Sequence, residues 1–180
     1  LPQYRELYGW IENNIFNNKE LVYKWMRGEI SSKEINRLIA KGTNFKEKFL
    51  NNTLLKSLQE FCLDERMLNI AKDLKNLYSK KIGIVTDNMD VFSNVIVEKH
   101  NLNKIFDAVV NSADCGCLKT EQGGRLFKKT LEILNEKIEN CLLVDDSIKT
   151  IEFFKEKGGQ IFLFNNNFEE LSNFLKTNGI

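Results

Sequence analysis

Two adjacent carboxylates, Asp145 and Asp146, directly follow an uncharged apolar run, Cys141-Leu142-Leu143-Val144. Such a run is typical of a strand that is buried on both faces, so we expect the carboxylates just past its carboxyl end. Ligands bind at that end of the strands in open α/β sheets. Neighbouring carboxylates repel each other unless a cation or a shared proton lies between them, and Mg²⁺ prefers one or two carboxylates with water and phosphate oxygens. The pair is therefore a candidate Mg²⁺ site. The structural alternative is that an Asp before Ile148 only caps a helix.

A hydroxyl and an ammonium group follow two other apolar runs in the same way. Thr86 ends the run 82–86, and Lys119 lies in the loop after the run 105–110. If all these runs are parallel strands, their carboxyl ends converge on one crevice and bring these groups to the acidic pair. Each residue alone has an ordinary explanation, Thr86 as a turn residue and Lys119 as one of many solvated lysines. The informative observation is the complete set, each member after its own strand.

A hydroxyl, an ammonium and a metal-binding acidic pair together suit a phosphoryl group. Thr86 and the backbone amides of Asp87 and Asn88 can donate hydrogen bonds to phosphate oxygens, and Lys119 can neutralise developing charge. A cation on the acidic pair can hold the phosphate from the other side. Phosphoryl transfer depends mostly on such positioning and charge stabilisation, so the residues indicate phosphoryl chemistry.

The stretches that must position these residues fall into an all-helical part and an alternating part. Residues 4–79 predict helices only, because apolar residues recur there at helical spacing and Ser31 and Glu34 form a capping box. From residue 81 on, strands alternate with helices, which predicts a parallel sheet with right-handed crossovers. The expected helices are 4–16, 20–27, 31–42, 45–50, 54–62, 64–78, 89–100, 126–138, 147–157 and 168–175, and the expected strands are 82–86, 105–110, 141–144 and 160–164.

Composition narrows the class of protein. The chain has 180 residues, enough for one domain or one domain with a small appendage. Its 26 basic and 25 acidic residues give a net charge of +1, which argues against nucleic acid and anionic membranes as partners. No apolar run approaches about 20 residues, so no membrane span is expected. The four cysteines carry no disulfide or metal pattern, and we expect reduced thiols in a cytoplasmic protein.

At these residues the sequence resembles a known family. The stretch 82–88, Lys119 and the stretch 142–147 look like the second, third and fourth motifs, in that order, of the haloacid dehalogenase-like (HAD) hydrolases. The segment Trp25 to Glu34, which includes Arg27-Gly28-Glu29-Ile30-Ser31, is similar to the helical cap of the phosphatase-type members. The resemblance implies an α/β fold with a Rossmann-like parallel sheet core, at residues 80–180, and an all-helical N-terminal cap, at residues 1–79.

The same resemblance implies roles for the site residues. It implies Mg²⁺ as cofactor and hydrolysis of a small-molecule phosphate ester. Thr86 would bind the phosphate with help from the amide of Asp87, Lys119 would be the family lysine, Asp146 would bind Mg²⁺ directly, and Asp145 would assist in the metal shell. The sequence carries no signal for the substrate or the oligomeric state.

One motif of the family is missing from these residues. The family's first motif is an apolar strand that ends in Asp-x-Asp-Gly and supplies the nucleophile and the acid/base. Asp64, Asp73 and Asp90 all lie in helical contexts without a preceding apolar strand. Because that strand is central in the family's sheet, its loss would leave unpaired backbone groups on both neighbours, each costing about 1–3 kcal/mol where buried. We therefore expect the strand, with its nucleophilic Asp, upstream of Leu1.

Four other functions use similar residues. A haloacid dehalogenase proper needs no metal, which leaves the acidic pair without a role, and a phosphomutase is a rarer variant of the same chemistry. A response-regulator receiver also combines an acidic pair with Thr and Lys, but it places the pair on its first strand. A non-catalytic binding or scaffold protein with this fold stays open if the missing strand lacks its Asp residues.

Overall fold

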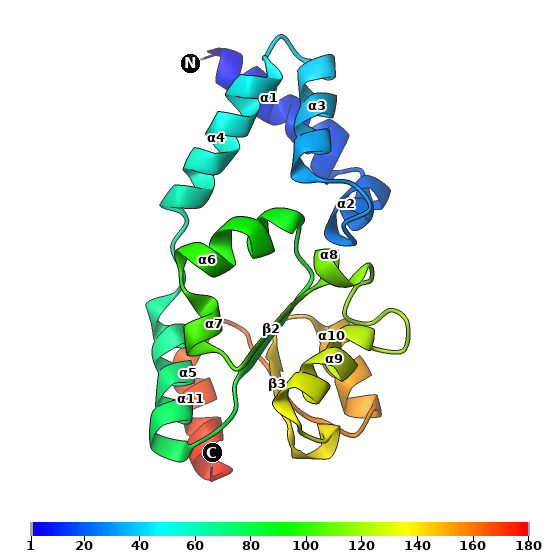
Figure 1. The fold of residues 1–180 in the computed structure, drawn as a ribbon. Coiled ribbons are helices and arrows are strands. Elements are labelled where there is room, and N and C mark those ends of the chain that lie inside the picture. Colours follow the sequence, from blue (N-terminus) through cyan, green and yellow to red (C-terminus); the bar gives the residue numbers. More distant parts are fainter. Residues whose placement is uncertain (1, 180) are drawn as a thin grey trace. The chain divides into compact units, whose positions relative to one another are not determined.

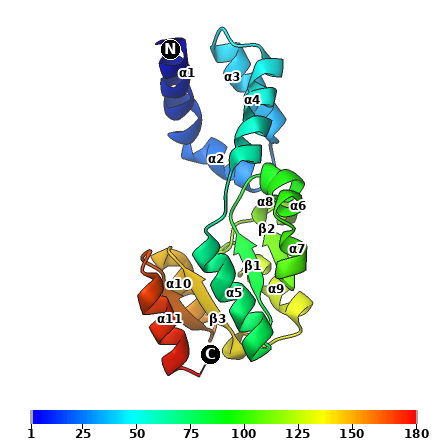
Figure 2. The same ribbon diagram turned by 90° about the vertical axis from the view of Figure 1, so that its left-hand side faces the viewer.

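The computed structural model describes residues 2–179, and the chain forms two compact units (Figures 1 and 2). The units are not consecutive stretches of sequence. Unit 1 consists of Leu1–Cys62, Thr86–His100 and Asn111–Leu118, and unit 2 consists of Leu63–Val85, Asn101–Val110 and Lys119–Ile180. The sequence predicts a helical cap at residues 1–79 and a core at residues 80–180, and this boundary stays a prediction.

Unit 1 is entirely helical apart from its loops and the end residues of two strands. Its elements are α1 (Pro2–Ile11), the π-helix η1 (Glu12–Phe16), α2 (Lys19–Met26), α3 (Ser32–Gly42), α4 (Glu47–Glu60), the π-helix η2 (Phe92–Ile96), α6 (Val97–Lys99) and α8 (Ser112–Cys115). The core contains one aromatic and four aliphatic residues: Ile15, Trp25, Ile35, Ile39 and Leu50. The capping box predicted for α3 is present, because Ser31 accepts from the Glu34 amide and the Glu34 side chain accepts from the Ser31 amide.

Helix α4 corrects the expectation of two short helices at 45–50 and 54–62. One helix runs through Asn51, Asn52 and Thr53 without a break. No new helix begins at Asn52 or Thr53, and the neighbouring Asn51 accepts at its Oδ1 a hydrogen bond of 2.8 Å from Asn36 Nδ2 on α3. The Thr43 hydroxyl donates to the Ile39 carbonyl at the end of α3. Packing between α3 and α4 therefore overrides local capping preference.

Unit 2 is an α/β assembly in which strands lie between helices (Figure 1). Its elements are α5 (Glu65–Tyr78), β1 (Gly83–Thr86, the last residue in unit 1), α7 (Leu102–Ile105), β2 (Ala108–Asn111, the last residue in unit 1), α9 (Arg125–Leu134), the 3₁₀ helix η3 (Ile138–Asn140), β3 (Leu142–Asp145), α10 (Ile148–Glu156), β4 (Gln160–Leu163) and α11 (Phe168–Thr177). Helices α5 and α11 lie on one side of the strands and α9 and α10 on the other. This arrangement confirms the expected α/β class with an all-helical N-terminal part.

The four strands form two separate two-stranded sheets instead of the single sheet expected. Strand β3 pairs in parallel with β4, with Leu142 opposite Gln160 and Asp145 opposite Leu163. Strand β2 begins later than expected, because residues 102–105 form α7. The side chains of β3 are only partly buried, although the sequence predicted burial on both faces. One face packs against the cluster of Phe162, Leu171 and Leu175, which α5 also contacts through Met67, Ile70 and Leu74.

Candidate active site

Three residues expected to bind phosphate lie in unit 1: Thr86 ends β1, and Asp87 and Asn88 follow in the loop after it. The Asn88 amide donates to the Ser112 hydroxyl at 2.9 Å, and the Met89 amide donates to Asn88 Oδ1 at 2.9 Å. The Asn88 N–H is thus already engaged, which differs from its expected use as a phosphate donor. Thr86 Oγ1 and Asn88 Nδ2 make no hydrogen bond to another described residue, so both groups can donate to an anion.

Ser112 is a structural residue of this loop that the sequence reasoning missed. Its side chain is completely buried, and its Oγ lies 2.6 Å from the Met26 carbonyl oxygen and 3.1 Å from the Asn88 carbonyl oxygen. One hydroxyl therefore joins the end of α2, the start of α8 and the loop after β1. The available signal was the polar pair Asn111-Ser112 immediately after the apolar residues of β2.

Asp90 connects the same segment to the first turn of α3. Its carboxylate accepts the Ser32 amide at 3.1 Å to each oxygen, the Trp25 indole N–H at 3.2 Å, and the Ser32 hydroxyl. Four hydrogen bonds to one carboxylate fix the residues after Asn88 against two helices of unit 1. A carboxylate at a helix N-terminus is also favoured by the helix dipole.

In unit 2, Lys119 and Asp145 form an ion pair with 2.6 Å between Nζ and Oδ2. Both side chains are largely buried, with 13% and 8% of their surfaces exposed. The other oxygen of Asp145 accepts the Ser147 amide at 2.8 Å. Ser147 itself caps α10 by accepting from the Thr150 amide at 3.3 Å. The alternative that an aspartate of this pair only caps the helix is therefore wrong, because the following serine takes that position.

Asp146 is the exposed member of the pair, and its carboxylate makes no hydrogen bond or ion pair with another described residue. It lies in the wall of a cavity of about 620 Å³ at the carboxyl ends of β3 and β4, together with Met67, Val144, Asp145, Ile148, Leu163, Phe164, Asn165 and Asn166. A solvent-facing carboxylate beside an ion-paired one suits a hard cation such as Mg²⁺. Within residues 2–179, no three His, Cys, Asp or Glu residues gather at metal-binding distance.

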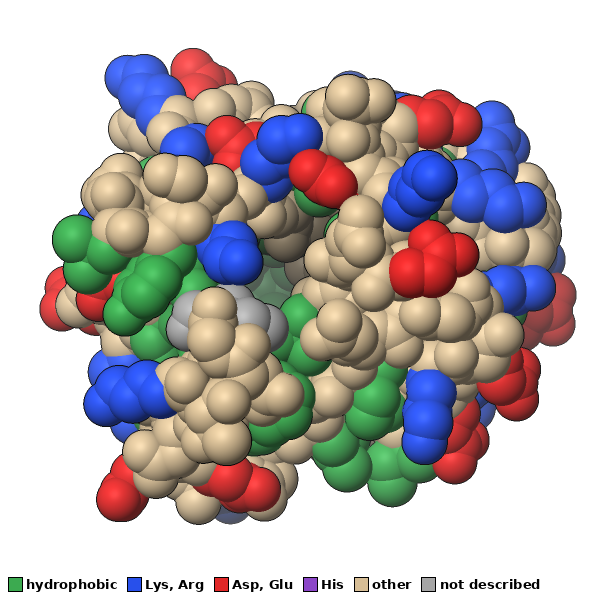
Figure 3. All heavy atoms as spheres, turned by 90° about the horizontal axis from the view of Figure 1, so that it is seen from below, with side chains coloured by type: hydrophobic (Ala, Val, Ile, Leu, Met, Phe, Trp, Pro, Cys, Tyr) green, Lys and Arg blue, Asp and Glu red, His purple; other side chains and the backbone are tan. Residues whose placement is uncertain are grey.

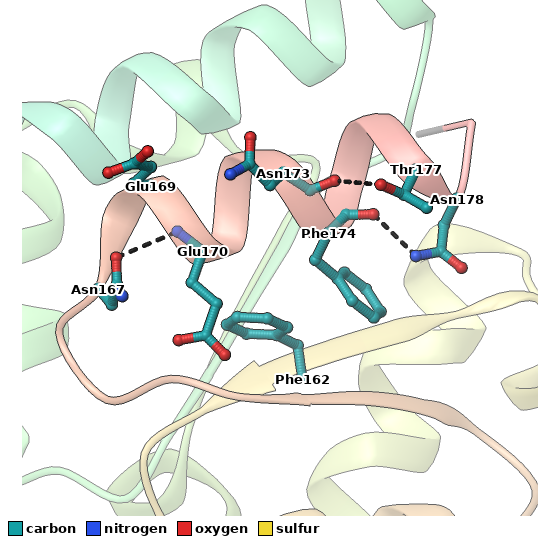
Figure 4. Close-up of a pocket in the computed structure, with 8 residues that line it drawn as sticks. All are labelled: Phe162, Asn167, Glu169, Glu170, Asn173, Phe174, Thr177 and Asn178. Carbon is teal, nitrogen blue, oxygen red and sulfur yellow. Dashed lines mark hydrogen bonds between the residues drawn. The ribbon is translucent and has the colours of Figure 1, made fainter.

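A second hollow of unit 2, of about 480 Å³, contains none of the predicted site residues (Figure 4). It is lined by Phe162 and by residues of α11 and its N-cap: Asn167, Glu169, Glu170, Asn173, Phe174, Thr177 and Asn178. Asn167 accepts from the Glu170 amide, and Thr177 and Asn178 donate to carbonyls one turn earlier. These groups satisfy the helix itself, so we assign the hollow a structural role.

Comparison with protein families identifies the family of this chain. The family model for haloacid dehalogenase-like hydrolases matches residues 12–158. The chain therefore belongs to this family of hydrolases. A comparison with curated proteins finds no match. Among residues 2–179, no helix is long and apolar enough to cross a membrane.

Two of the solved structures with the same fold come from bacteria. A predicted HAD-like family hydrolase of Porphyromonas gingivalis superposes with a TM-score of 0.72 at 12% identity, over 97% of this chain and 87% of that one. A HAD family enzyme of Bacteroides thetaiotaomicron, in complex with magnesium and inorganic phosphate, superposes with a TM-score of 0.63 at 14% identity, over 87% of this chain and 83% of that one. At these identities the similarity establishes the fold.

Proposed function

We propose that this protein is a Mg²⁺-dependent phosphatase that hydrolyses a small phosphorylated metabolite. The observation that carries the proposal is the difference between the two adjacent aspartates. Asp145 is held by Lys119 at 2.6 Å and by the Ser147 amide at 2.8 Å, whereas Asp146 faces a cavity without a partner among the described residues. A free, exposed carboxylate next to a fixed one is suited to binding a hard cation. The magnesium and phosphate bound to the Bacteroides enzyme support the same cofactor and ligand class.

The residues of this chain have distinct roles in the proposal. Asp146 would bind Mg²⁺ directly, and Asp145 would assist in the metal shell. Lys119, fixed by its ion pair, would place a positive charge near the phosphoryl group, and the Thr86 hydroxyl and the loop through Asp87 and Asn88 would bind its oxygens. When bound, Mg²⁺ supplies charge that stabilises phosphoryl oxygens.

The nucleophile is the part of the site that these residues do not supply. We infer that an Asp upstream of Leu1 attacks the phosphorus atom, so that an aspartyl-phosphate bond forms while the ester P–O bond breaks and the alcohol leaves. Water then hydrolyses the acyl phosphate and releases inorganic phosphate. Lys119 would hold the attacking carboxylate and the phosphate together.

The test is turnover of a panel of phosphate monoesters by the complete polypeptide, with Mg²⁺ or with EDTA. We expect inorganic phosphate release only with Mg²⁺, and its loss in the Asp146→Asn variant. Asp73→Asn is the matched control, because Asp73 is an exposed carboxylate of α5 that belongs to none of the motifs. Mg²⁺ binding without hydrolysis of any ester would reject the phosphatase and favour the non-catalytic alternative.

A further inference from the structure

The cavity at Asp146 lies at the end of the β3–β4 pair. Asp145 is opposite Leu163 in the parallel register, and the Phe164 amide donates to the Asp145 carbonyl at 2.9 Å. The pairing therefore continues one residue past Leu163, and residues 165–166 leave β4 next to Asp146 as part of the cavity wall. The volume of about 620 Å³ falls within the range of about 300–1,000 Å³ that is typical of small-molecule sites.

The wall of this cavity combines apolar side chains with uncharged amides. Five of its nine residues are apolar: Met67, Val144, Ile148, Leu163 and Phe164. Ile148 and Leu163 leave 60% and 42% of their surfaces exposed, and an apolar group that covers them removes this area from water. No Lys, Arg, His or Glu among the described residues lines the cavity, whereas charged side chains of both signs are spread over the face in Figure 3.

Phe164 is a fixed part of the apolar wall. Its ring meets the Phe168 ring edge to face, with 5.0 Å between the centroids. The Arg66 guanidinium covers Phe168 at 3.9 Å from the ring centroid and is paired with Asp64 at 2.6 Å. This stack holds the wall in place before a ligand arrives, which reduces the entropy lost on binding.

Asn166 supplies a hydrogen-bonding group to the same cavity. Its backbone is left-handed, with φ of +66°, a conformation that Asn adopts more readily than most residues. Asn165 Oδ1 accepts from the Asn167 amide at 3.3 Å, whereas the Asn166 carboxamide makes no hydrogen bond to another described residue. Because a carboxamide both donates and accepts, it can bind a hydroxyl or a carbonyl group of a ligand.

We propose that this cavity holds the alcohol part of the phosphate ester and selects an uncharged alcohol that has an apolar ring or chain and one hydroxyl or carbonyl group. The inference rests on the proposed function, which places the phosphoryl group at Asp146. Asn166 binds the hydroxyl or carbonyl group, and Ile148 and Leu163 cover the apolar part. A second ionised group on the alcohol is disfavoured, because the wall offers it no partner and burying an unpaired charge is costly.

Paired substrates test this selection in the complete polypeptide with Mg²⁺. Benzyl phosphate has an apolar ring, hydroxymethylbenzyl phosphate adds a hydroxyl, and phosphoglycolate carries a carboxylate instead. We expect kcat/KM to be at least about tenfold higher for benzyl phosphate than for phosphoglycolate. The best hydroxymethyl isomer should gain about a further fivefold, because it forms one more hydrogen bond.

Two variants separate the two contacts. Asn166→Gly removes the carboxamide and keeps the left-handed backbone, so the preference for the hydroxymethyl isomer should disappear while benzyl phosphate is hydrolysed as before. Asn135→Gly is the matched control, because Asn135 has φ of +50° at the end of α9, outside the cavity. Leu163→Gln should lower kcat/KM for benzyl phosphate by about tenfold relative to phosphoglycolate. Ile133→Gln, at an exposed apolar residue of α9, should change neither.

Equal kcat/KM for benzyl phosphate and phosphoglycolate would overturn the proposal, as would a hydroxymethyl preference that survives in Asn166→Gly. Failure of the proposed function gives a different result, because no ester is then hydrolysed. In that case calorimetric binding of the same esters in Mg²⁺ tests the cavity alone. Tighter binding of the benzyl esters, weakened by Leu163→Gln, would support this occupant, and equal affinities would reject it.

Discussion

The ammonium of Lys119 lies 2.6 Å from the Asp145 carboxylate, and only 13% and 8% of the two side chains are exposed. Removing one partner leaves a buried charge uncompensated, which typically costs about 3–5 kcal/mol of unfolding free energy. We therefore expect Lys119→Met to lower stability by this amount in urea unfolding. Lys119→Met combined with Asp145→Leu should cost less than the sum of the single changes. Lys24→Met is the control, because Lys24 pairs with Glu20 on the surface, and its urea midpoint should stay nearly unchanged. Additive losses in the double variant would contradict the pairing.

Ser112 fixes the loop after β1 by accepting a hydrogen bond from the Asn88 amide and donating one to the Met26 carbonyl. Ser112→Ala leaves these buried groups without a partner, so we expect a loss of about 1–3 kcal/mol in urea unfolding. The KM for a phosphate ester should rise as well, because the donors of this loop lose their support. Ser57→Ala is the matched control, since Ser57 on α4 bonds only the Thr53 carbonyl at an exposed position. Its effect should stay within about 0.5 kcal/mol. A Ser112→Ala protein as stable as the control would contradict this role.

Alanine substitutions at Gly28 and Gly116 distinguish the cost of backbone strain from the cost of steric overlap. Both have left-handed backbones, with φ of +69° and +70°. A Cβ at Gly28 would lie 2.3 Å from the Ala113 carbonyl oxygen, whereas a Cβ at Gly116 meets nothing within 4 Å. Gly116→Ala should cost about 1–2 kcal/mol from the backbone alone. Gly28→Ala should cost at least about 1 kcal/mol more, because the α2 end and α8 must separate. Equal losses in thermal unfolding would show that this contact is not tight.

Asp107 should make unit 2 sensitive to acid. Lys75, 2.6 Å away, and the Ile82 amide, 2.9 Å away, lower the pKa of this carboxyl below its usual value. A group whose pKa is depressed by folding adds stability above its unfolded pKa, about 3.9, and loses that contribution as the pH falls through the folded pKa. The urea midpoint of the wild type should fall below about pH 4, and Asp107→Asn should show a shallower fall from a lower starting midpoint. Parallel curves for the two proteins would contradict this assignment.

Local interactions made much of this fold predictable from sequence. The Ser31–Glu34 capping box, the Asp64 cap of α5 and the apolar runs of the strands depend on neighbours in sequence, and the structure contains all of them. The break expected before residue 54 was wrong because Asn51 pairs with Asn36, a contact between helices that spacing does not encode.

The candidate site was predictable to a similar extent. The order of Thr86, Lys119 and the acidic pair along the chain identified the family, and the Lys119–Asp145 pair follows from strand order. Ser112 and Asp90 were not predicted, because their partners lie far away in sequence, in α2, in α3 and in the loop after β1. The substrate is set by side chains whose arrangement no local pattern encodes.

The measurement that tests the central claim most directly is the Mg²⁺ dependence of phosphate-ester hydrolysis by the complete polypeptide and its Asp146→Asn and Asp73→Asn variants. Outer-shell changes alone typically cost about 10–100-fold in metal affinity, so loss of a direct ligand should raise the half-saturating Mg²⁺ concentration by at least about 100-fold. We predict this shift for Asp146→Asn and wild-type behaviour for Asp73→Asn. Hydrolysis with an unchanged Mg²⁺ dependence in Asp146→Asn, or hydrolysis that persists in EDTA, would contradict the assignment of this carboxylate as the metal ligand.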